Sequence, residues 1–221
     1  MSFSDQWNKI YSQKHHMSIW PWSDLVSLVF RYILPFKKNF SVLELGCGAG
    51  ANIPFFLSLG ANYYAIEGSQ TIVKKVKKKF PELVNNILIG DFTKDIPFPN
   101  KFDLIVDRAS VTHNSTNAII KCLNMVYEKL IDRGKYIGID WFSTMHSEFI
   151  NGVMDEDNFT RCDYASGQFS NVGRVHFSDK NHLLELFRRF EVILLQHKNI
   201  KTEIPHDGTN FASWNLVVEK K

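Results

Sequence analysis

The 221-residue sequence has few cysteines, no long apolar run and little net charge. Its three cysteines are far apart and form no CxxC pair or other metal-ligand spacing, so neither a disulfide framework nor a metal site is expected. No apolar run approaches the roughly 20 residues that cross a bilayer. The first residues, MSFSDQWNKIYSQ, lack the basic start and apolar stretch of a secretory signal. We therefore expect a soluble, cytoplasmic protein with reduced thiols and no membrane partner.

The formal net charge of +3 is too small to indicate a dedicated nucleic-acid binder. A dense lysine run lies in one predicted helix, but Val73, Val76 and Phe80 fall at i, i+3 and i+7 and would face the core. The lysines are then interpreted as a solvated face: Lys74, Lys75, Lys77, Lys78 and Lys79. No internal repeat or low-complexity linker divides the chain, so we expect one domain over residues 1–221.

Short apolar strands alternate with helical stretches after Pro35, which is typical of an α/β fold with a parallel sheet covered on both faces. The predicted strands are Phe40 to Leu45, Asn62 to Glu67, Ile87 to Gly90, Phe102 to Asp107 and Lys135 to Trp141. The predicted helices are Ala51 to Leu59, Thr71 to Phe80 and Asn117 to Ile131.

Three further segments complete the predicted domain. The tail reads as a helix, a strand, a polar connection and a last strand, and two strands joined without a helix can pair antiparallel. Its predicted elements are Asp179 to Arg189, Phe190 to His197 and Phe211 to Glu219. Residues 1–39, which contain Trp7, Tyr11, Trp20 and Trp22, form an N-terminal helical cap. Residues 142–178 have no clear periodicity, and an insertion this long is usually functional or carries short elements.

The most informative stretch is Val42 to Phe56, which reads VLELGCGAGANIPFF. An apolar strand ends there and is followed by three alternate glycines, Gly46, Gly48 and Gly50, and then by a helix start. Glycines let the backbone turn sharply and approach a ligand closely, and the N–H groups at a helix start favour electron-rich groups. Cys47 lies within this loop, where a small packed side chain is a simpler interpretation than a nucleophile. The stretch therefore predicts a site for a nucleotide-type ligand.

The chain resembles the class I S-adenosylmethionine-dependent methyltransferases over about residues 40–219. Their first motif is an acidic residue followed by alternate glycines, which corresponds here to Glu44 with Gly46, Gly48 and Gly50. In that family the glycine loop lies against the methionine part of the cofactor. The acidic residue orders the loop or reaches the cofactor's amino group.

Three further motifs carry the resemblance. Glu67, followed by Gly68, ends the second strand and would accept hydrogen bonds from the two ribose hydroxyls. Asp91 within Gly-Asp-Phe would accept a hydrogen bond from the adenine amino group, and Phe92 would pack against the ring. Asp107 ends the fourth strand, which faces the reactive sulfur in these enzymes. The resemblance implies a Rossmann-like, doubly wound, mostly parallel sheet with a C-terminal antiparallel pair, and S-adenosylmethionine as cofactor.

The same glycines also fit the dinucleotide pattern G-x-G-x-x-G/A through Gly46, Gly48 and Ala51, and Glu67 would suit a nicotinamide ribose. Glu44, Gly50 and the Gly90-Asp91-Phe92 step favour methyl transfer. A nicotinamide-dependent reductase and a catalytically inactive binding module remain as alternatives.

The predicted catalytic residues are His113, Asp107 and Asp140, which follow or end strands on the carboxyl edge of the sheet. His113 and Asp140 could act as a base, which a sugar or alcohol hydroxyl usually needs and a phenol, thiol or amine often does not. Each also has a simpler interpretation, as an exposed loop residue or a packed strand end.

Other side chains near that edge also have both a functional and a structural interpretation. Arg108 would hold a ligand carboxylate or form a structural salt bridge, and Trp141 would form a wall or pack. His176 would reach the pocket or be structural. The adjacent His15 and His16 have no metal spacing with a third ligand. Trp20 and Trp22 would stack on an acceptor or pack in the core or a lid, and Tyr11 resembles a tyrosine that some small family members bring over the cofactor.

The acceptor is indicated only by residues 142–178, which we expect to cover the substrate. This insertion has a net charge of −3, from Glu148, Asp155, Glu156, Asp157 and Asp163 against Arg161 and Arg174. An acidic cover repels a phosphate backbone and suits a small neutral or cationic acceptor. We therefore expect a small-molecule or sugar-type methyltransferase, with O-methylation ahead of N-methylation. A nucleic-acid or protein methyltransferase is the alternative, and the oligomeric state is open.

Overall fold

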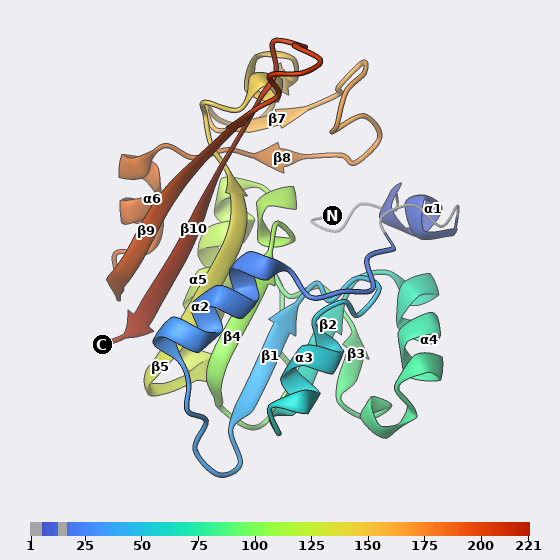
Figure 1. The fold of residues 1–221 in the computed structure, drawn as a ribbon, viewed down its shortest axis with the longest axis vertical. Coiled ribbons are helices and arrows are strands. Elements are labelled where there is room, and N and C mark those ends of the chain that lie inside the picture. Colours follow the sequence, from blue (N-terminus) through green and yellow to red (C-terminus); the bar gives the residue numbers. More distant parts are fainter. Residues whose placement is uncertain (1–5, 13–16) are drawn as a thin grey trace.

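The computed structural model describes residues 6–12 and 17–221, and within them the central sheet has seven strands in the order β3-β2-β1-β4-β5-β10-β9 (Figure 1). Neighbouring strands from β3 to β5 run parallel. β10 is antiparallel to both β5 and β9. This topology confirms the predicted mostly parallel sheet with an antiparallel pair at the C-terminus. The strands are β1 Ser41–Leu45, β2 Asn62–Glu67, β3 Ile87–Ile89, β4 Phe102–Arg108, β5 Leu130–Phe142, β9 Phe190–Lys201 and β10 Asn210–Lys220.

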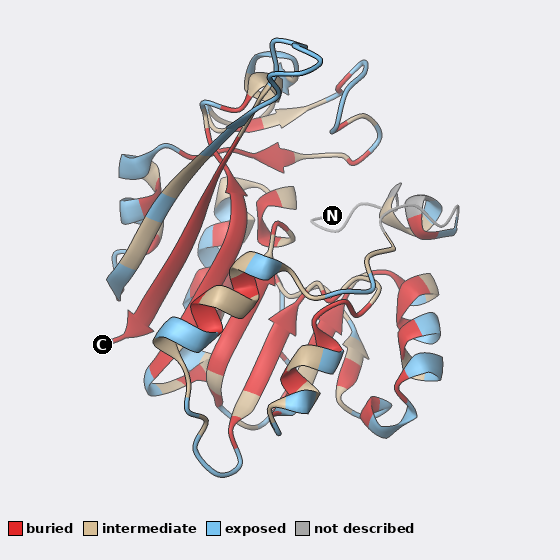
Figure 2. Cartoon of the chain, viewed as in Figure 1, coloured by how far each residue is buried: buried red, intermediate tan, exposed pale blue. Residues whose placement is uncertain are grey.

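Helices cover both faces of this sheet, and the strands between them are largely buried (Figure 2). α2, α3 and α4 bury their apolar sides in one core cluster, and α5 and α6 do so in a second. This arrangement follows from the amphipathic spacing of the helices, which gives each one apolar side to pack on the sheet. The helices are α1 Gln6–Ser12, α2 Ser23–Tyr32, α3 Ile53–Ser58, α4 Gln70–Lys79, α5 Thr116–Lys129 and α6 Lys180–Leu186. None of the described helices is long and apolar enough to span a membrane.

Side-chain caps fix where three of these helices begin. Ser69, Ser115 and Asp179 each accept a hydrogen bond from the backbone N–H three residues later. Such caps satisfy N–H groups that have no partner within the helix. Because α4 and α5 follow β2 and β4 closely, these caps also order the chain at the carboxyl edge of the sheet.

The lysine run lies as predicted on the outer side of α4. Val73 and Val76 are buried, whereas Lys74 and Lys78 are exposed. Three of the lysines lie in the last turn, where positive charge is favourable to the helix dipole.

The insertion at residues 142–178 forms short elements beyond the carboxyl edge of the main sheet (Figure 1). A 3₁₀ turn, η3 Ser147–Ile150, precedes a small antiparallel sheet in the order β6-β7-β8. A third apolar cluster, which includes Phe142, Phe169 and Phe177, lies under it. The strands are β6 Val153–Met154, β7 Thr160–Cys162 and β8 Val175–His176. The aromatic residues of this aperiodic segment therefore form a local core.

The two long strands of the tail extend further than their apolar patterns predict. β9 continues to Lys201 and pairs along its whole length with β10. Much of β9 is exposed because it is the edge strand, so its end carries polar residues that still form ladder hydrogen bonds. β5 likewise begins at Leu130, directly after α5, rather than at Lys135.

Candidate active site

A cavity opens at the carboxyl edge of the sheet, between the glycine loop, the N-terminal segment and the insertion. The glycine loop and the ends of β2 and β3 supply the first part of its lining: Gly46, Gly48, Glu67, Gly68, Asp91 and Phe92. The turn after β4 supplies the second part: Arg108, Ala109, Ser110, His113 and Asn114. Trp7, Tyr11 and Trp22 approach from the N-terminal segment. Phe142, Gln168, Phe169 and Val172 approach from the insertion.

The glycine loop leaves little room for side chains at Gly46 and Gly48. Gly46 and Gly48 have φ angles of +72° and +50°, in the left-handed region that favours glycine. A Cβ on Gly46 would lie 2.4 Å from the Cβ of Ser110, and one on Gly48 would lie 3.1 Å from the Tyr11 hydroxyl. Gly50 is also left-handed, but a Cβ there would meet Ile53 at 2.9 Å, so this glycine serves helix packing behind the loop. Gly46 and Gly48 thus leave a bare backbone surface at the cavity.

Glu44 links the glycine loop to its surroundings from below. Its buried carboxylate accepts hydrogen bonds from Asn52 Nδ2 at 2.8 Å and from the Tyr63 hydroxyl at 2.5 Å. Asn52 in turn accepts a bond from the backbone N–H of Trp22 at 3.3 Å. Of the two roles implied for this acid, these contacts correspond to ordering the loop. Burial raises the pKa of Glu44 to about 7, despite these two hydrogen bonds.

This raised pKa predicts a pH-dependent stability that can be measured. The folded protein binds the Glu44 proton more tightly than the unfolded chain, so stability from this group is full below about pH 4.5 and is lost as pH rises through 7. Glu44→Gln removes the charge, while its amide oxygen can still accept from Asn52 Nδ2 and its amide N–H can donate to the Tyr63 hydroxyl oxygen. We expect urea unfolding to show the variant gaining up to about 3 kcal/mol relative to wild type between pH 5 and pH 8.

A matched change at the exposed Glu203 provides the control, because Glu203→Gln removes a carboxylate on the β9–β10 connection. A constant difference between Glu44→Gln and wild type over that pH range would contradict the raised pKa.

Glu67 is the last residue of β2, and Asp91 lies two residues after β3. Both line the cavity. Glu67 accepts backbone hydrogen bonds from Gly48 N and Ser69 N, each at 2.9 Å, which ties the glycine loop to β2. Asp91 accepts from Thr93 N at 3.0 Å and Thr93 Oγ1 at 2.6 Å. Carboxylate oxygens have further lone pairs, so both residues can still accept hydrogen bonds from ligand hydroxyl or amino groups.

Asp107 is not among the described residues that line the cavity. Its buried carboxylate accepts from Ser110 N at 2.9 Å, Val111 N at 3.0 Å and Trp141 Nε1 at 2.9 Å, and also from the hydroxyls of Ser110 and Tyr136. These donors hold the turn that presents Ala109 and Ser110 to the cavity. Geometry therefore favours a positioning role for Asp107 over a base.

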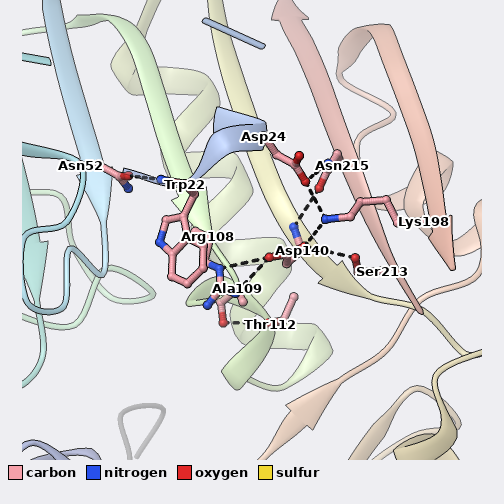
Figure 3. Close-up of polar contacts among 10 residues, drawn as sticks. All are labelled: Trp22, Asp24, Asn52, Arg108, Ala109, Thr112, Asp140, Lys198, Ser213 and Asn215. Atoms are coloured by element: carbon pink, nitrogen blue, oxygen red, sulfur yellow. Dashed lines mark hydrogen bonds and ion pairs between the residues drawn. The ribbon is translucent and has the colours of Figure 1, made fainter. Parts of the chain in front are cut away.

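Asp140 is likewise absent from the described lining and lies at the centre of a charged network (Figure 3). Its Oδ2 accepts from Arg108 Nε at 3.1 Å, and its Oδ1 accepts from Lys198 Nζ at 2.9 Å and Ser213 Oγ at 3.2 Å. The next residue, Trp141, is fully buried. Both residues thus match the interpretation as packed strand ends.

His113 is the predicted catalytic residue that the structure brings to the cavity. It lies in the 3₁₀ turn η2 Val111–His113, with its Nδ1 3.0 Å from the carbonyl oxygen of Arg174. A carbonyl only accepts, so Nδ1 carries the proton and Nε2 is the basic nitrogen of the neutral ring. Trp7 and Phe142 contact the ring edge to face, at centroid distances of 5.1 and 5.9 Å. This packing fixes the orientation of the imidazole.

The other candidate groups have structural partners. His176 is fully buried, with its Nε2 3.1 Å from His182 Nε2, and burial lowers its pKa to about 3. Burial raises the pKa of the Cys47 thiol well above its usual value, which disfavours the thiolate. Trp20 is exposed and outside the described lining. His15 and His16 lie outside the described residues, within which no group of three or more possible metal ligands occurs.

The acidic residues of the insertion do not form part of the described cavity wall. Arg174 pairs with Asp155, and Asp157 accepts from the backbone N–H groups of Phe159 and Thr160, both at 2.8 Å. The insertion instead lines the cavity with apolar and aromatic side chains and Gln168. Sequence reasoning missed Phe169 and Gln168 because the segment has no periodicity to orient them. Asn52 was detectable as the residue between the glycines and α3.

Comparison with known proteins identifies the motif region. Residues 43–138 match the family model of a methyltransferase domain. A segment of 77 residues is 31% identical to protein-L-isoaspartate O-methyltransferase of Flavobacterium johnsoniae; it covers 34% of this chain and 36% of that enzyme. The chain thus matches only about a third of the length of that relative.

Solved structures share the fold at low sequence identity. A S-adenosylmethionine-dependent methyltransferase of Methanosarcina mazei is 14% identical with a TM-score of 0.68, over 91% of this chain and 98% of that one. The glycopeptide N-methyltransferase MtfA, in complex with S-adenosylmethionine, is 16% identical with a TM-score of 0.60, over 94% and 89%. Of the two cofactors that the glycine pattern allows, the methyltransferase-domain match favours S-adenosylmethionine. Residues 43–138 therefore match a methyltransferase domain, and the chain as described shares the fold of S-adenosylmethionine-dependent methyltransferases.

Proposed function

We propose that this protein transfers the methyl group of S-adenosylmethionine to a small organic acceptor held between the glycine loop and the insertion. The observation that carries this proposal is a single cavity wall that joins the cofactor motifs to His113 and to an aromatic surface. The aromatic surface comes from Phe142 and Phe169, with Trp7 on the N-terminal side. Such a lining suits a flat, partly apolar acceptor with a few polar groups.

The cofactor-binding side would be formed by the residues that end the first three strands. Gly46 and Gly48 would let the cofactor approach the backbone closely. A Cβ at either position would be strained, so both positions need glycine. Glu67 would accept from ribose hydroxyls and Asp91 from the adenine amino group, with Gly68 and Phe92 beside them. S-adenosylmethionine supplies an electrophilic methyl group on a positively charged sulfur. The protein's contribution is to exclude water and align the acceptor, which is worth several kcal/mol.

His113 would act as the general base for a hydroxyl acceptor. Its Nδ1–H is held by the Arg174 carbonyl, so Nε2 can take the acceptor's proton. This arrangement favours O-methylation over N-methylation, because an amine loses its proton readily without such help. Asp107 would position the turn that carries His113, and Asp140 would position Arg108.

A protein or nucleic-acid acceptor is the alternative. The partial relative from Flavobacterium johnsoniae is named as a protein O-methyltransferase, and MtfA as a glycopeptide N-methyltransferase. The aromatic wall contributed by the insertion favours the small acceptor. With a protein or nucleic-acid acceptor, this wall would have to fit around a bulky chain.

A labelled-methyl assay tests the proposal. The purified protein is incubated with methyl-labelled S-adenosylmethionine and, separately, with hydroxylated aromatics, sugars, amines, RNA, DNA and a protein extract. We expect label in one or more small hydroxylated compounds. Label in RNA, DNA or protein alone would overturn the acceptor assignment, and binding without transfer to any acceptor would indicate an inactive binding module.

A further inference from the structure

Arg108 is the only lysine or arginine among the described residues that line the cavity. The other charged groups in that lining are the carboxylates of Glu44, Glu67 and Asp91. A single cation in an otherwise acidic and aromatic wall needs an explanation. Methyl transfer to a hydroxyl acceptor with His113 as base does not use it.

The guanidinium group of Arg108 is held in one orientation by the protein (Figure 3). Its Cζ lies 3.7 Å from the ring centroid of Trp22, a distance typical of a cation–π contact. Nε and Nη2 both lie 3.1 Å from Asp140 Oδ2. Trp22 therefore covers one face of the guanidinium, and Asp140 takes the side edge that Nε and Nη2 share.

Asp140 leaves the other end of the fork available. A guanidinium has five N–H donors, and the contacts with Asp140 use one from Nε and one from Nη2. Within the described residues, Nη1 and the second N–H of Nη2 have no protein partner, and the side chain is 33% exposed. Two parallel N–H groups at the end of the fork match the two oxygens of a carboxylate.

The charged residues around Arg108 also hold it in place. Lys198 bridges Asp140 and Asp24, at 2.9 and 2.6 Å, so two cations and two carboxylates sum to zero. Only Arg108 of these four lines the cavity. The cluster fixes the guanidinium of Arg108 beside the cavity.

We infer that Arg108 binds a carboxylate of a molecule in the cavity. The inference rests on the proposed function, which supplies two sources for this group: the methionyl part of S-adenosylmethionine and a carboxylate on the acceptor. Trp22 and Asp140 act as positioning residues that preorganise the guanidinium.

The test compares ligands with and without the carboxylate on the same variant. Isothermal titration measures S-adenosylmethionine and its decarboxylated analogue against wild type, Arg108→Gln and Arg108→Lys. If the cofactor is the source, Arg108→Gln weakens S-adenosylmethionine by about ten- to a hundredfold and leaves the analogue within about twofold. Arg108→Lys keeps the charge without the forked pair of N–H donors, so its affinity for S-adenosylmethionine should fall between those of wild type and Arg108→Gln. A misfolded variant would lose both ligands, and thermal unfolding identifies it.

The acceptor arm uses benzoate and benzamide as probes, observed by ligand NMR with the protein saturated in S-adenosylhomocysteine. If the acceptor is the source, wild type binds benzoate more tightly than benzamide and Arg108→Gln removes that preference without affecting the cofactor. Arg189→Gln is the matched control, because Arg189 also stacks on an aromatic ring, Tyr127, and pairs with Glu128 away from this cavity. We expect it to change neither arm.

Two negative results have different meanings. If Arg108→Gln leaves both the cofactor discrimination and the benzoate preference unchanged, Arg108 is a structural ion pair and the inference is wrong while the proposed function stands. If wild type binds neither S-adenosylmethionine nor its decarboxylated analogue, the proposed function fails and the inference fails with it.

Discussion

Replacing Gly48 with valine should reduce the affinity for S-adenosylhomocysteine by more than about a hundredfold, which corresponds to at least about 3 kcal/mol. The backbone of Gly48 is left-handed, with φ at +50°, and its N–H is bonded to Glu67. A branched side chain there would start 3.1 Å from the Tyr11 hydroxyl and extend into the cavity. It would also strain the backbone that holds Glu67 in place. Isothermal titration of the variant measures the loss.

Gly60→Val separates this loss from general destabilisation. Gly60 has a similar φ of +76°, but nothing lies within 4 Å of the Cβ that a side chain would add. Both variants should unfold at a lower temperature because a β-branched residue is strained at positive φ. Only Gly48→Val should lose the ligand. Affinity within about threefold of wild type in Gly48→Val would show that this loop does not bind the cofactor.

Replacing His113 with alanine should slow methyl transfer to a hydroxyl acceptor by about 10²- to 10⁴-fold, the range typical of a lost general base. Affinity for S-adenosylhomocysteine should stay within about twofold, because the ring lies on the β4 side of the cavity, away from Glu67 and Asp91. In wild type the rate should depend on pH through the general base, and the variant should lack that dependence. The measurement is the pH–rate profile with the first hydroxyl acceptor that the labelled-methyl assay identifies.

His206→Ala is the matched control for this change, since His206 is exposed on the β9–β10 connection. Its profile should match that of wild type. An unchanged rate and pH profile in His113→Ala would exclude the histidine as the base.

Much of the fold could be predicted because its signals are local. Each central strand is a short apolar run, and each helix between them has one apolar side, so the alternation defines the parallel sheet. The extents of β5 and β9 could not be predicted, because they depend on partners distant in sequence. The end of β9 near Lys201 is polar and exposed, and is a strand only because β10 pairs with it.

The same distinction applies to the site. Gly46, Gly48, Glu67 and Asp91 could be placed at the cavity because each ends or follows a strand in the parallel part of the sheet. Asp107 also lies at the end of such a strand, but its side chain accepts hydrogen bonds from the N–H groups of its own turn. The sequence pattern does not predict this orientation.

Contributions from outside the repeating strand and helix pattern escaped prediction. Phe169 and Gln168 reach the cavity through the small sheet of the insertion, and the acidic residues beside them have structural partners instead. Net charge over a segment therefore gave the wrong polarity for the wall it forms. Arg108 had two interpretations from sequence: the salt bridge is present with Asp140, and the inferred ligand contact would use the other edge of the same guanidinium.

We expect the edge formed by Gly48, Glu67 and Asp91 to bind S-adenosylmethionine. Isothermal titration of wild-type protein with S-adenosylhomocysteine and, separately, with NADH tests it most directly. We predict saturable one-to-one binding of S-adenosylhomocysteine and no heat with NADH. Binding of NADH without binding of S-adenosylhomocysteine would show that this edge is a site for a nicotinamide dinucleotide instead.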